Sequence, residues 1–546
     1  MKKISIIFFV ILTLYCSGIY SQVNQEWVAT YSGTTSGTTP GYNYSYKCLT
    51  DKENNVIVIG RSTGVQDDAI VLKYNPSGNL LWERRYNGIG NEHDRFRDAV
   101  LDDSNNIYVT GETYEGSSGG TYNWITVKYK PNGDTAWLRI FKGPGQLGDV
   151  PSAMVKDKNN NIYITGYCTI VLPVFFDMYT IKYSSDGEFL WERNYASISG
   201  GQDRGFSITA DDSNNVYASG YGSLLGGNEI VTIKYNTYGD EIWIKKLPTN
   251  GGDFLRPTKS IIDKYNNVIV NGYYDWFGQY AFITIKYNTD GDTLWKRIYK
   301  GTGNLDFCHA LCTDDSANVY AAGRNTSTGT GNDFLTIKYN QFGDTSWIRI
   351  LDGGFGQSDE IYSIAIDSIH NVYVTGRSDS TNGMSDYLTV KYNGDGNLIW
   401  LKKYDYSNLV DRSISIYLDN NNNIIVSGFS ERIPDIFNIT TIKYSLFTDI
   451  NNLQNLHNSY NFIHQNYPNP FNPVTSIKYY LNKNGFVIIK IYNSLGKEVK
   501  RLIEKDTGEG EHNLIFNGED LPSGIYFYSL TINGNLINTK RMALIK

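Results

Sequence analysis

The chain has 546 residues, of which 14% are aromatic and 19% charged, with 44 Tyr, 53 Gly and a net charge of −7. Strand-forming residues punctuated throughout by Gly and Asn favour an all-β protein with many short strands. No basic stripe or Lys/Arg block is present that would follow a phosphate backbone, so nucleic acid is not an expected partner.

The N-terminus carries the three parts of a secretory signal peptide. Two lysines follow Met1, the run from Ile4 to Tyr15 is apolar, and small residues come next. We therefore expect a signal peptide at residues 1–21. Cys16 offers a lipid anchor as the alternative, which the bulky Tyr15 before it disfavours. No later apolar run approaches the roughly 20 residues of a membrane helix, so no transmembrane segment is expected.

The exported part of the chain keeps four cysteines, for which we expect no disulfide and no zinc site. Cys308 and Cys312 are four residues apart in a predicted strand, a separation of about 13 Å that is too long for a disulfide. Zinc requires clustered Cys and His, whereas the six histidines are scattered. We interpret the cysteines as small buried residues: Cys48, Cys168, Cys308 and Cys312.

A ten-residue motif recurs along the chain, first as KYNPSGNLLW from Lys73 to Trp82. In every copy eight residues separate Tyr from Trp and four separate Gly from Trp. Such constancy predicts a tight hairpin, with Asn, Pro, Ser, Asp and Gly in the turn between two alternating strands. The other six copies begin at Lys128, Lys182, Lys234, Lys286, Lys338 and Lys391.

A second motif recurs eight times and precedes the hairpin. It is an Asp, a short Asn-rich turn and a strand that ends in Gly, as in DDSNNIYVTG from Asp102 to Gly111. Another short alternating segment lies before each Asp. Each period of about 52 residues therefore holds four strands, the content of one β-propeller blade. The terminal glycines are Gly60, Gly111, Gly166, Gly220, Gly272, Gly323, Gly376 and Gly428.

The two ends of the repeat region predict a closed ring. Lys443 and Tyr444 form an eighth Lys-Tyr strand with no Trp after it, and Trp27 to Tyr31 forms an eighth Trp strand with no Lys-Tyr before it. If the first strand completes the last blade, no sheet edge is left exposed at the seam. We therefore predict an eight-bladed β-propeller over residues 22–444.

The repeated residues have structural explanations. We expect the Trp of each blade to be buried between blades, the Asp and Asn residues to cap their own turns rather than bind calcium, and the Lys stem to snorkel to solvent. The connection from the terminal Gly to the next Lys varies, from 13 residues after Gly60 to 17 after Gly111. Length variation on one face is typical of the binding side.

These two motifs, Asp-x-x-Asn-Asn-x-Tyr-Val-Thr-Gly and Lys-Tyr-Asn-x-x-Gly-Asp-x-x-Trp, resemble the SBBP-type bacterial β-propeller repeat. The resemblance covers residues 27–444 and implies the fold. It implies no reaction, because that family is defined by its blades.

The repeat does not continue into the C-terminal part of the chain. An Asn-rich linker is predicted at residues 445–462, followed at 463–546 by short strands between Pro and Gly turns, which predict a small immunoglobulin-like β-sandwich. Its Pro-Asn-Pro opening, its Leu-Pro-Ser-Gly-x-Tyr segment and its terminal Lys-Arg-Met-x-Leu-Ile-Lys resemble the type A C-terminal sorting domain of the type IX secretion system. This resemblance implies a partner in the secretion machinery, passage through the periplasm, and a secreted or cell-surface protein.

Two functions fit this architecture. The first is a non-catalytic binding or adhesion module that presents the loop-rich face to a glycan, protein or surface polymer. The second is an enzyme at the propeller axis, such as a polysaccharide hydrolase or lyase, or a quinoprotein oxidoreductase. No catalytic, cofactor-binding or metal-binding residues are predicted and no cofactor is expected. The dense ionisable positions, which a solvated loop face explains, are Glu92, His93, Asp94, Arg95, Arg97, Asp98, Asp203, Arg204 and His309.

Overall fold

The computed structural model describes residues 23–446 and 462–546, apart from residues 34–40, 65, 117–120, 146–147, 171–174, 198–200, 225–226, 248–253, 277, 304, 328–330, 355, 381–382, 464–465, 467, 482 and 495. The chain divides into two compact units, Met1–Leu446 and Phe447–Lys546. The predicted signal peptide, with Cys16, and nearly all of the predicted linker lie outside the described residues.

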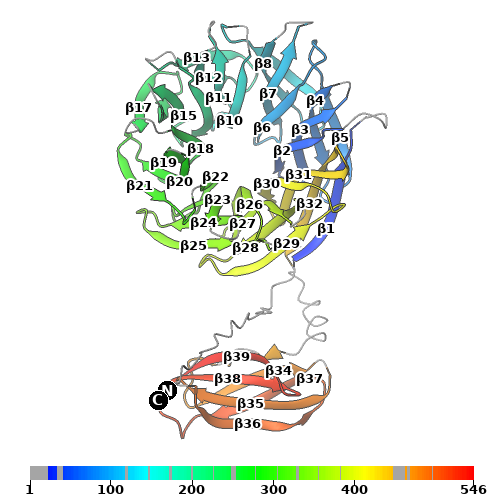
Figure 1. Ribbon diagram of the computed structural model, residues 1–546, viewed down its shortest axis with the longest axis vertical. Helices are drawn as coiled ribbons and strands as arrows, with labels where there is room; N and C mark the ends of the chain where they lie inside the picture. The colour runs from blue at the N-terminus through cyan, green and yellow to red at the C-terminus, as the bar shows by residue number, and fades with distance from the viewer. Residues whose placement is uncertain are drawn as a thin grey trace, which may run out of the picture. The chain divides into compact units, whose positions relative to one another are not determined.

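The first unit is a succession of groups of four antiparallel strands that stand around a ring (Figure 1); one parallel bridge, between Asn228 and Phe254, joins two neighbouring groups into one sheet. The inner strands of neighbouring sheets contact each other all the way round, from β2 through β6, β10, β14, β18, β22, β26 and β30 back to β2. The described strands give eight such groups: β2–β5, β6–β9, β10–β13, β14–β17, β18–β21, β22–β25, β26–β29, and β30–β32 with β1. The all-β fold of repeated blades is thus confirmed.

The strands of this unit are β1 (Val23–Tyr31), β2 (Tyr44–Thr50), β3 (Val56–Thr63), β4 (Asp67–Tyr74), β5 (Leu80–Tyr86), β6 (Arg95–Leu101), β7 (Ile107–Glu115), β8 (Thr121–Tyr129), β9 (Thr135–Phe141), β10 (Val150–Lys156), β11 (Ile162–Thr169), β12 (Phe176–Tyr183), β13 (Phe189–Tyr195), β14 (Arg204–Ala210), β15 (Val216–Leu224), β16 (Gly227–Tyr235), β17 (Glu241–Leu247), β18 (Phe254–Ile262), β19 (Val268–Trp276), β20 (Gln279–Tyr287), β21 (Thr293–Tyr299), β22 (Phe307–Thr313), β23 (Val319–Ser327), β24 (Gly331–Tyr339), β25 (Thr345–Leu351), β26 (Asp359–Ile366), β27 (Val372–Asp379), β28 (Ser385–Tyr392), β29 (Leu398–Tyr404), β30 (Asp411–Leu418), β31 (Ile424–Ile433) and β32 (Ile436–Leu446).

The Asn-rich turns between inner and second strands are built as predicted. The Asp102 carboxylate accepts hydrogen bonds from the N–H groups of Ser104 (2.9 Å) and Asn106 (2.8 Å). Asn105 adopts a left-handed conformation (φ 61°), which Asn tolerates better than most residues. The carboxylates of this motif therefore cap their own turns. The same capping occurs at Asp51, Asp157, Asp211, Asp263, Asp314, Asp367 and Asp419.

Each hairpin glycine packs against the tryptophan ring of the preceding blade. Trp295 is 5% exposed, and its indole N–H donates to the Gln341 carbonyl oxygen in the next blade (3.1 Å). Gly343 has φ +85°, and a Cβ there would lie 2.7 Å from the Trp295 ring. The predicted packing between blades is confirmed for Trp137, Trp191, Trp295, Trp347 and Trp400, which are buried, while Trp82 and Trp243 are half-buried.

The lysine of the Lys-Tyr strand does not snorkel to solvent, so that prediction is wrong. Lys286 is 1% exposed, and its ammonium group lies 2.6 Å from the Asp263 carboxylate of the turn. Lys73 pairs in the same way with Asp51 (2.9 Å). In these blades the turn carboxylate supplies the counter-charge for the buried ammonium group.

The N-terminal strand closes the ring. β1 pairs antiparallel with β32, with Trp27 opposite Lys443 and Tyr31 opposite Ile439. The predicted pairing of the first Trp strand with the last Lys-Tyr strand is therefore confirmed. Trp27 also donates its indole N–H to the Pro76 carbonyl oxygen (2.9 Å). Six other tryptophans donate to the blade that follows them in the same way: Trp82, Trp137, Trp191, Trp243, Trp295 and Trp347.

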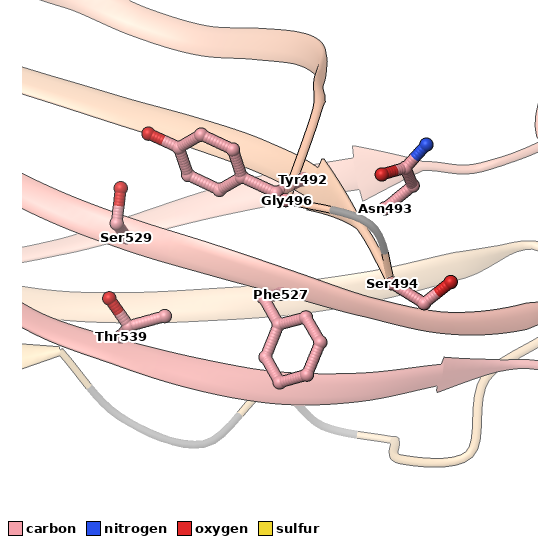
Figure 2. Close-up of a pocket in the computed structure, with 7 residues that line it drawn as sticks. All are labelled: Tyr492, Asn493, Ser494, Gly496, Phe527, Ser529 and Thr539. Carbon is pink, nitrogen blue, oxygen red and sulfur yellow. The ribbon is translucent and has the colours of Figure 1, made fainter. Parts of the chain in front are cut away.

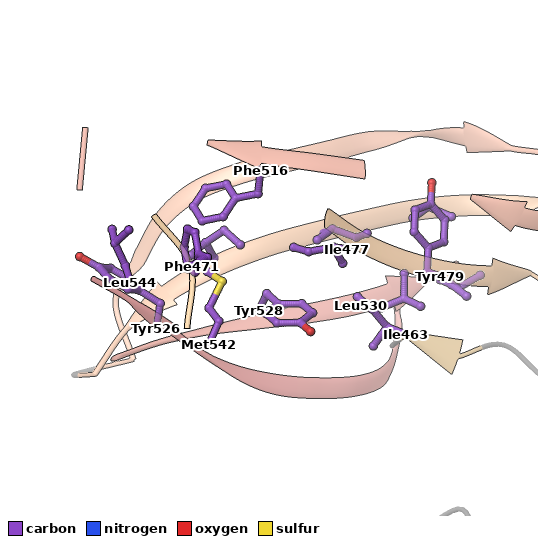
Figure 3. Packing of buried hydrophobic residues seen from close by; sticks show 14 of the residues in the cluster. Ile463, Phe471, Ile477, Tyr479, Phe516, Tyr526, Tyr528, Leu530, Met542 and Leu544 are labelled. Atoms are coloured by element: carbon purple, nitrogen blue, oxygen red, sulfur yellow. The ribbon is translucent and has the colours of Figure 1, made fainter. Parts of the chain in front are cut away.

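The second unit packs two sheets around one apolar core (Figure 3). Ile477 and Phe516 come from one sheet, and Ile489 and Tyr528 come from the other; all four are at most 1% exposed. The sheets are β33 (Phe462–Ile463), β34 (Val474–Leu481) and β37 (Gly510–Asn517), and β36 (Glu498–Thr507), β35 (Gly485–Asn493), β38 (Gly524–Ile532) and β39 (Asn535–Leu544).

Within the described residues, no helix has the length and apolarity needed to cross a membrane. The described cysteines, Cys48, Cys168, Cys308 and Cys312, are all free thiols, as expected from their spacing, and the first three are buried.

Candidate binding face

Each blade places one cross-strand pair of side chains at the start of its inner strand, on the loop-rich face. One member is among the first three residues of the inner strand, and the other follows the terminal Gly of the second strand. Seven of the eight pairs contain an arginine. The pairs are Tyr44–Arg61, Arg95–Glu112, Val150–Tyr167, Arg204–Tyr221, Arg256–Tyr273, Phe307–Arg324, Glu360–Arg377 and Arg412–Phe429.

Guanidinium groups and aromatic rings of these pairs stack on one another from blade to blade. The Arg204 guanidinium lies 4.5 Å from the centre of the Tyr167 ring in the preceding blade. Arg324 lies 4.2 Å from the Phe307 ring, which in turn packs 4.7 Å from Tyr273. Such contacts hold a guanidinium group in place while leaving its N–H groups available. We call this set the arginine–aromatic belt: Arg61, Arg95, Arg97, Arg204, Arg256, Arg324, Arg377 and Arg412 with Tyr44, Tyr167, Tyr221, Tyr273, Phe307 and Phe429.

The belt carries an excess of positive charge although the chain as a whole is negative. Arg95 and Arg97 share the Glu112 carboxylate, and Arg324 and Arg377 share Glu360. Arg61 pairs with Asp67. The other three belt arginines have no carboxylate within 4.0 Å in the part of the chain that the structure describes: Arg204, Arg256 and Arg412.

Five belt arginines keep a buried Nε atom that has no hydrogen-bond partner in the described residues. A buried donor without an acceptor is costly, so such atoms mark positions where a ligand or ordered water completes the bonding. Because the five lie in five different blades, the unmet donors surround the axis. They are the Nε atoms of Arg61, Arg204, Arg324, Arg377 and Arg412.

One sector of the belt differs from the rest. Glu360 accepts hydrogen bonds from the His309 ring (2.8 Å) and the Tyr362 hydroxyl (2.8 Å) and forms an ion pair with Arg324 (3.2 Å). Burial alone would raise the pKa of Glu360, but the His309 hydrogen bond and the nearby positive charges outweigh it and lower the pKa to about 2. Glu360 is therefore ionised at any physiological pH.

The structure brings together on this face four of the nine ionisable residues that the sequence analysis singled out. Arg95, Arg97 and Arg204 belong to the belt, and His309 contacts it through Glu360. Asp98 does not join them, because its carboxylate accepts hydrogen bonds from the Lys47 ammonium group (2.6 Å) and the Met154 N–H.

The interpretation of those positions as a solvated loop face is wrong for the aspartates. Asp94 is fully buried, and its two carboxylate oxygens accept hydrogen bonds from the N–H groups of Gly88 and Tyr114. Asp203 is 1% exposed and is held in the same way. Each of these carboxylates fixes the loop that arrives from the preceding blade.

Sequence reasoning missed most of the belt, including Arg256 and Glu112. The signal was present in the repeats as Asp-Arg or Gly-Arg at equivalent positions. Asp-Arg occurs at Arg95, Arg204 and Arg412, and Gly-Arg occurs at Arg61, Arg324 and Arg377.

The second unit has a shallow open hollow of its own (Figure 2). Among the described residues that line it there is no carboxylate, histidine, cysteine or basic side chain. The lining residues are Tyr492, Asn493, Ser494, Gly496, Phe527, Ser529 and Thr539.

Comparison with protein families identifies both units. Residues 465–545 match the secretion system C-terminal sorting domain, and residues 347–383 match the beta-propeller repeat. The two resemblances drawn from the sequence are thereby confirmed. The sorting domain marks proteins exported by the type IX secretion system, so this protein is secreted or carried on the cell surface.

Individual relatives are distant. The chain is 23% identical over 517 residues to an uncharacterized WD repeat-containing protein of Acanthamoeba polyphaga mimivirus; the match covers 72% of this chain and 35% of that protein. The chain thus spans about a third of that relative's length.

Solved structures resemble the chain weakly. One is the crystal structure of polysaccharide lyase Uly1, with a TM-score of 0.40 and 8% identity over 78% of this chain and 99% of that chain. Another is the crystal structure of the eukaryotic initiation factor, with a TM-score of 0.40 and 7% identity over 89% and 93%. Likeness at this level carries no argument about activity.

Proposed function

We propose that the exported protein is a non-catalytic binding module that holds acidic polysaccharide on the arginine–aromatic belt. The observation that carries this proposal is the ring of guanidinium groups on one face, three of which have no ion-pair partner among the described residues. Guanidinium groups bind carboxylates and sulfates in a two-pronged geometry. Aromatic rings between them offer flat apolar surfaces to the faces of sugar rings. Delivery by the sorting domain places the belt where extracellular polymers are found.

The charge distribution favours an anionic ligand over a neutral one. Arg204, Arg256 and Arg412 have no ion-pair partner among the described residues, whereas acidic side chains offset the other belt arginines. A neutral glycan would leave these three charges uncompensated. An anionic chain that follows the belt would pair with each of them in turn.

A second candidate is a polysaccharide hydrolase or lyase, favoured by the one irregular sector of the belt. His309, Glu360 and Tyr362 form a hydrogen-bonded cluster that breaks the repeat symmetry, as a catalytic propeller should. However, burial raises the pKa of Tyr362 above its ordinary value, which disfavours that residue as a base. Release of unsaturated or reducing sugar ends from uronate polymers would support this candidate.

Affinity electrophoresis tests the proposal. Polygalacturonate and dextran sulfate should retard the purified protein, and neutral dextran should not. The variant R204A/R256A should lose most of this retardation, because it removes two unpaired charges from the belt. A matched control is K142A/K158A, which removes two equally charged but exposed side chains (65% and 61% exposed).

Three results would contradict the proposal: equal retardation by neutral dextran, an unaffected R204A/R256A variant, or a clear preference for single-stranded DNA. The last result matters because alternating arginine and aromatic side chains can also bind single-stranded nucleic acid.

A further inference from the structure

Within the described residues a buried aspartate recurs where the chain enters six of the blades, and in four of them both of its oxygens are satisfied. Asp203 shows the pattern: one oxygen accepts the N–H of Ser197 and the other accepts the N–H of Ser223 (2.7 Å). These four copies need no further partner. They are Asp94, Asp149, Asp203 and Asp306.

Asp411, the copy in the last blade, is different. One of its oxygens accepts the N–H of Tyr406 (2.9 Å), but the other has no hydrogen-bond partner, although the residue is fully buried. The N–H group that would serve this oxygen belongs to Glu431, and it donates to the Val410 carbonyl oxygen instead (2.8 Å). Asp411 therefore carries one buried oxygen that no backbone N–H reaches.

Two further carboxylates converge on this position. Oxygen atoms of Asp386, Asp405 and Asp411 all lie within 4.8 Å of one another. Asp386 comes from the third strand of the preceding blade, and Asp405 comes from the loop between the two blades. Three acidic groups from two neighbouring blades and the loop between them are thus held close together.

Two further polar side chains lie on the strands next to Asp411. Ser430 lies directly opposite Asp411 in the sheet, is fully buried and interacts with its carboxyl group. Asn438 lies opposite Ser430 on the next strand, is 3% exposed, and its side-chain oxygen has no hydrogen-bond partner among the described residues. A second unmet oxygen atom therefore lies on β32, in the same row of side chains as Asp411 on β30.

We infer that Asp386, Asp405 and Asp411 bind one calcium ion at the junction of these two blades. The donors are all oxygens, which is the ligand chemistry of calcium. Calcium–oxygen distances of about 2.4 Å place ligands on opposite sides of the ion roughly 4.8 Å apart. The oxygen atoms of the three carboxylates lie within that limit of one another. The ion would also satisfy the oxygen of Asp411 that the backbone leaves unmet.

Isothermal titration of calcium chloride into the EDTA-treated mature protein tests this inference. At least one equivalent of calcium should bind, and magnesium should bind roughly tenfold more weakly or less, because it demands a shorter, near-octahedral set of ligands. The variant D386N/D405N should lose one equivalent. The substitution of Asp405 should not disturb the folding of this variant, because Asp405 is exposed. The control D134N/D240N removes two exposed turn carboxylates and should keep every equivalent.

A second cluster of carboxylates affects the number of calcium equivalents expected for the wild type. Asp333, Asp352 and Asp359 converge in the same way one blade earlier. Two equivalents in the wild type and one in D386N/D405N would support the inference for the later cluster. Absence of calcium binding to the wild type, or an unchanged stoichiometry in D386N/D405N, would overturn it. Neither outcome depends on whether the belt binds polysaccharide.

Discussion

The Lys286 ammonium group lies 2.6 Å from the Asp263 carboxylate, and both side chains are buried. Asp263 simultaneously caps its own turn through the N–H groups of Tyr265 and Asn267. The ion pair therefore ties the turn between the inner and second strands to the third strand of the same blade. The pairs of Lys73 with Asp51 and of Lys443 with Asp419 show that this tie recurs around the ring.

Substituting one partner of this ion pair should lower the free energy of unfolding more than substituting both partners. K286M leaves a buried carboxylate without its counter-charge and should lower the free energy of unfolding by about 3–5 kcal/mol. K286M/D263N should recover part of that loss, since Asn keeps the oxygen that caps the turn. Urea denaturation followed by tryptophan fluorescence measures both.

The exposed pair of Lys158 and Asp212 provides the control for this experiment. K158M should leave stability unchanged, because exposed ion pairs contribute little. If K286M is as stable as K158M, the ammonium group reaches solvent and the buried pairing is wrong.

Removing one inter-blade tryptophan should destabilise the whole propeller unit. Trp347 is buried, and its indole N–H donates to the Gly394 carbonyl oxygen of the next blade (3.1 Å). W347A should cost about 3–5 kcal/mol, the usual range for truncating a core aromatic residue. The exposed Phe342 gives a control: F342A should have little effect on the urea midpoint. Equal midpoints for the two variants would refute a packing role for Trp347.

Glu360 should make stability depend on pH only in the acid range. Its pKa is lowered in the folded protein to about 2, whereas in the unfolded chain it is near the ordinary value of about 4.3. Its contribution is therefore complete above about pH 4.3 and is lost as the pH falls towards 2. The difference in melting temperature between wild type and E360Q should be constant above pH 5 and should shrink below pH 4. A difference that grows on acidification would contradict the ion-pair assignment.

Much of the fold follows from the repeats, because a fixed spacing between Lys-Tyr, Gly and Trp constrains each hairpin locally. Even the ring closure was predictable from the unpaired Trp27 strand and the unpaired Tyr444 strand. The burial of Lys286 was not, since its counter-charge lies 23 positions away in another turn. Pairing across the sheet, rather than any local pattern, decides where that ammonium group goes.

The belt was largely missed for a related reason. His309 and Glu360 are 51 residues apart and meet only because neighbouring blades place equivalent positions side by side. The recurring Asp-Arg and Gly-Arg dipeptides mark the arginine positions, but no local pattern shows that arginines and aromatic residues of different repeats become neighbours in space.

The C-terminal unit should act as an export signal that the propeller does not need for folding. Its core is separate from the blades and is formed by residues such as Ile489 and Tyr528. Deletion of residues 447–546 should leave the melting temperature of the propeller nearly unchanged, because domains with separate cores couple weakly. In a host with the type IX system the truncated protein should stay in the periplasm. Its appearance at the cell surface or in the medium would contradict this role.

The most direct test of the account is the affinity of the belt for an acidic oligosaccharide. Isothermal titration calorimetry with oligogalacturonate should give a dissociation constant that weakens with added salt. In R204A/R256A/R412A it should weaken by about 100-fold or more, because each lost charge-assisted hydrogen bond costs roughly 1.5–3 kcal/mol. The circular dichroism spectrum should not change. An unchanged affinity in this variant, or equally tight binding of a neutral oligosaccharide to the wild type, would contradict the assignment of the arginine–aromatic belt as the binding site.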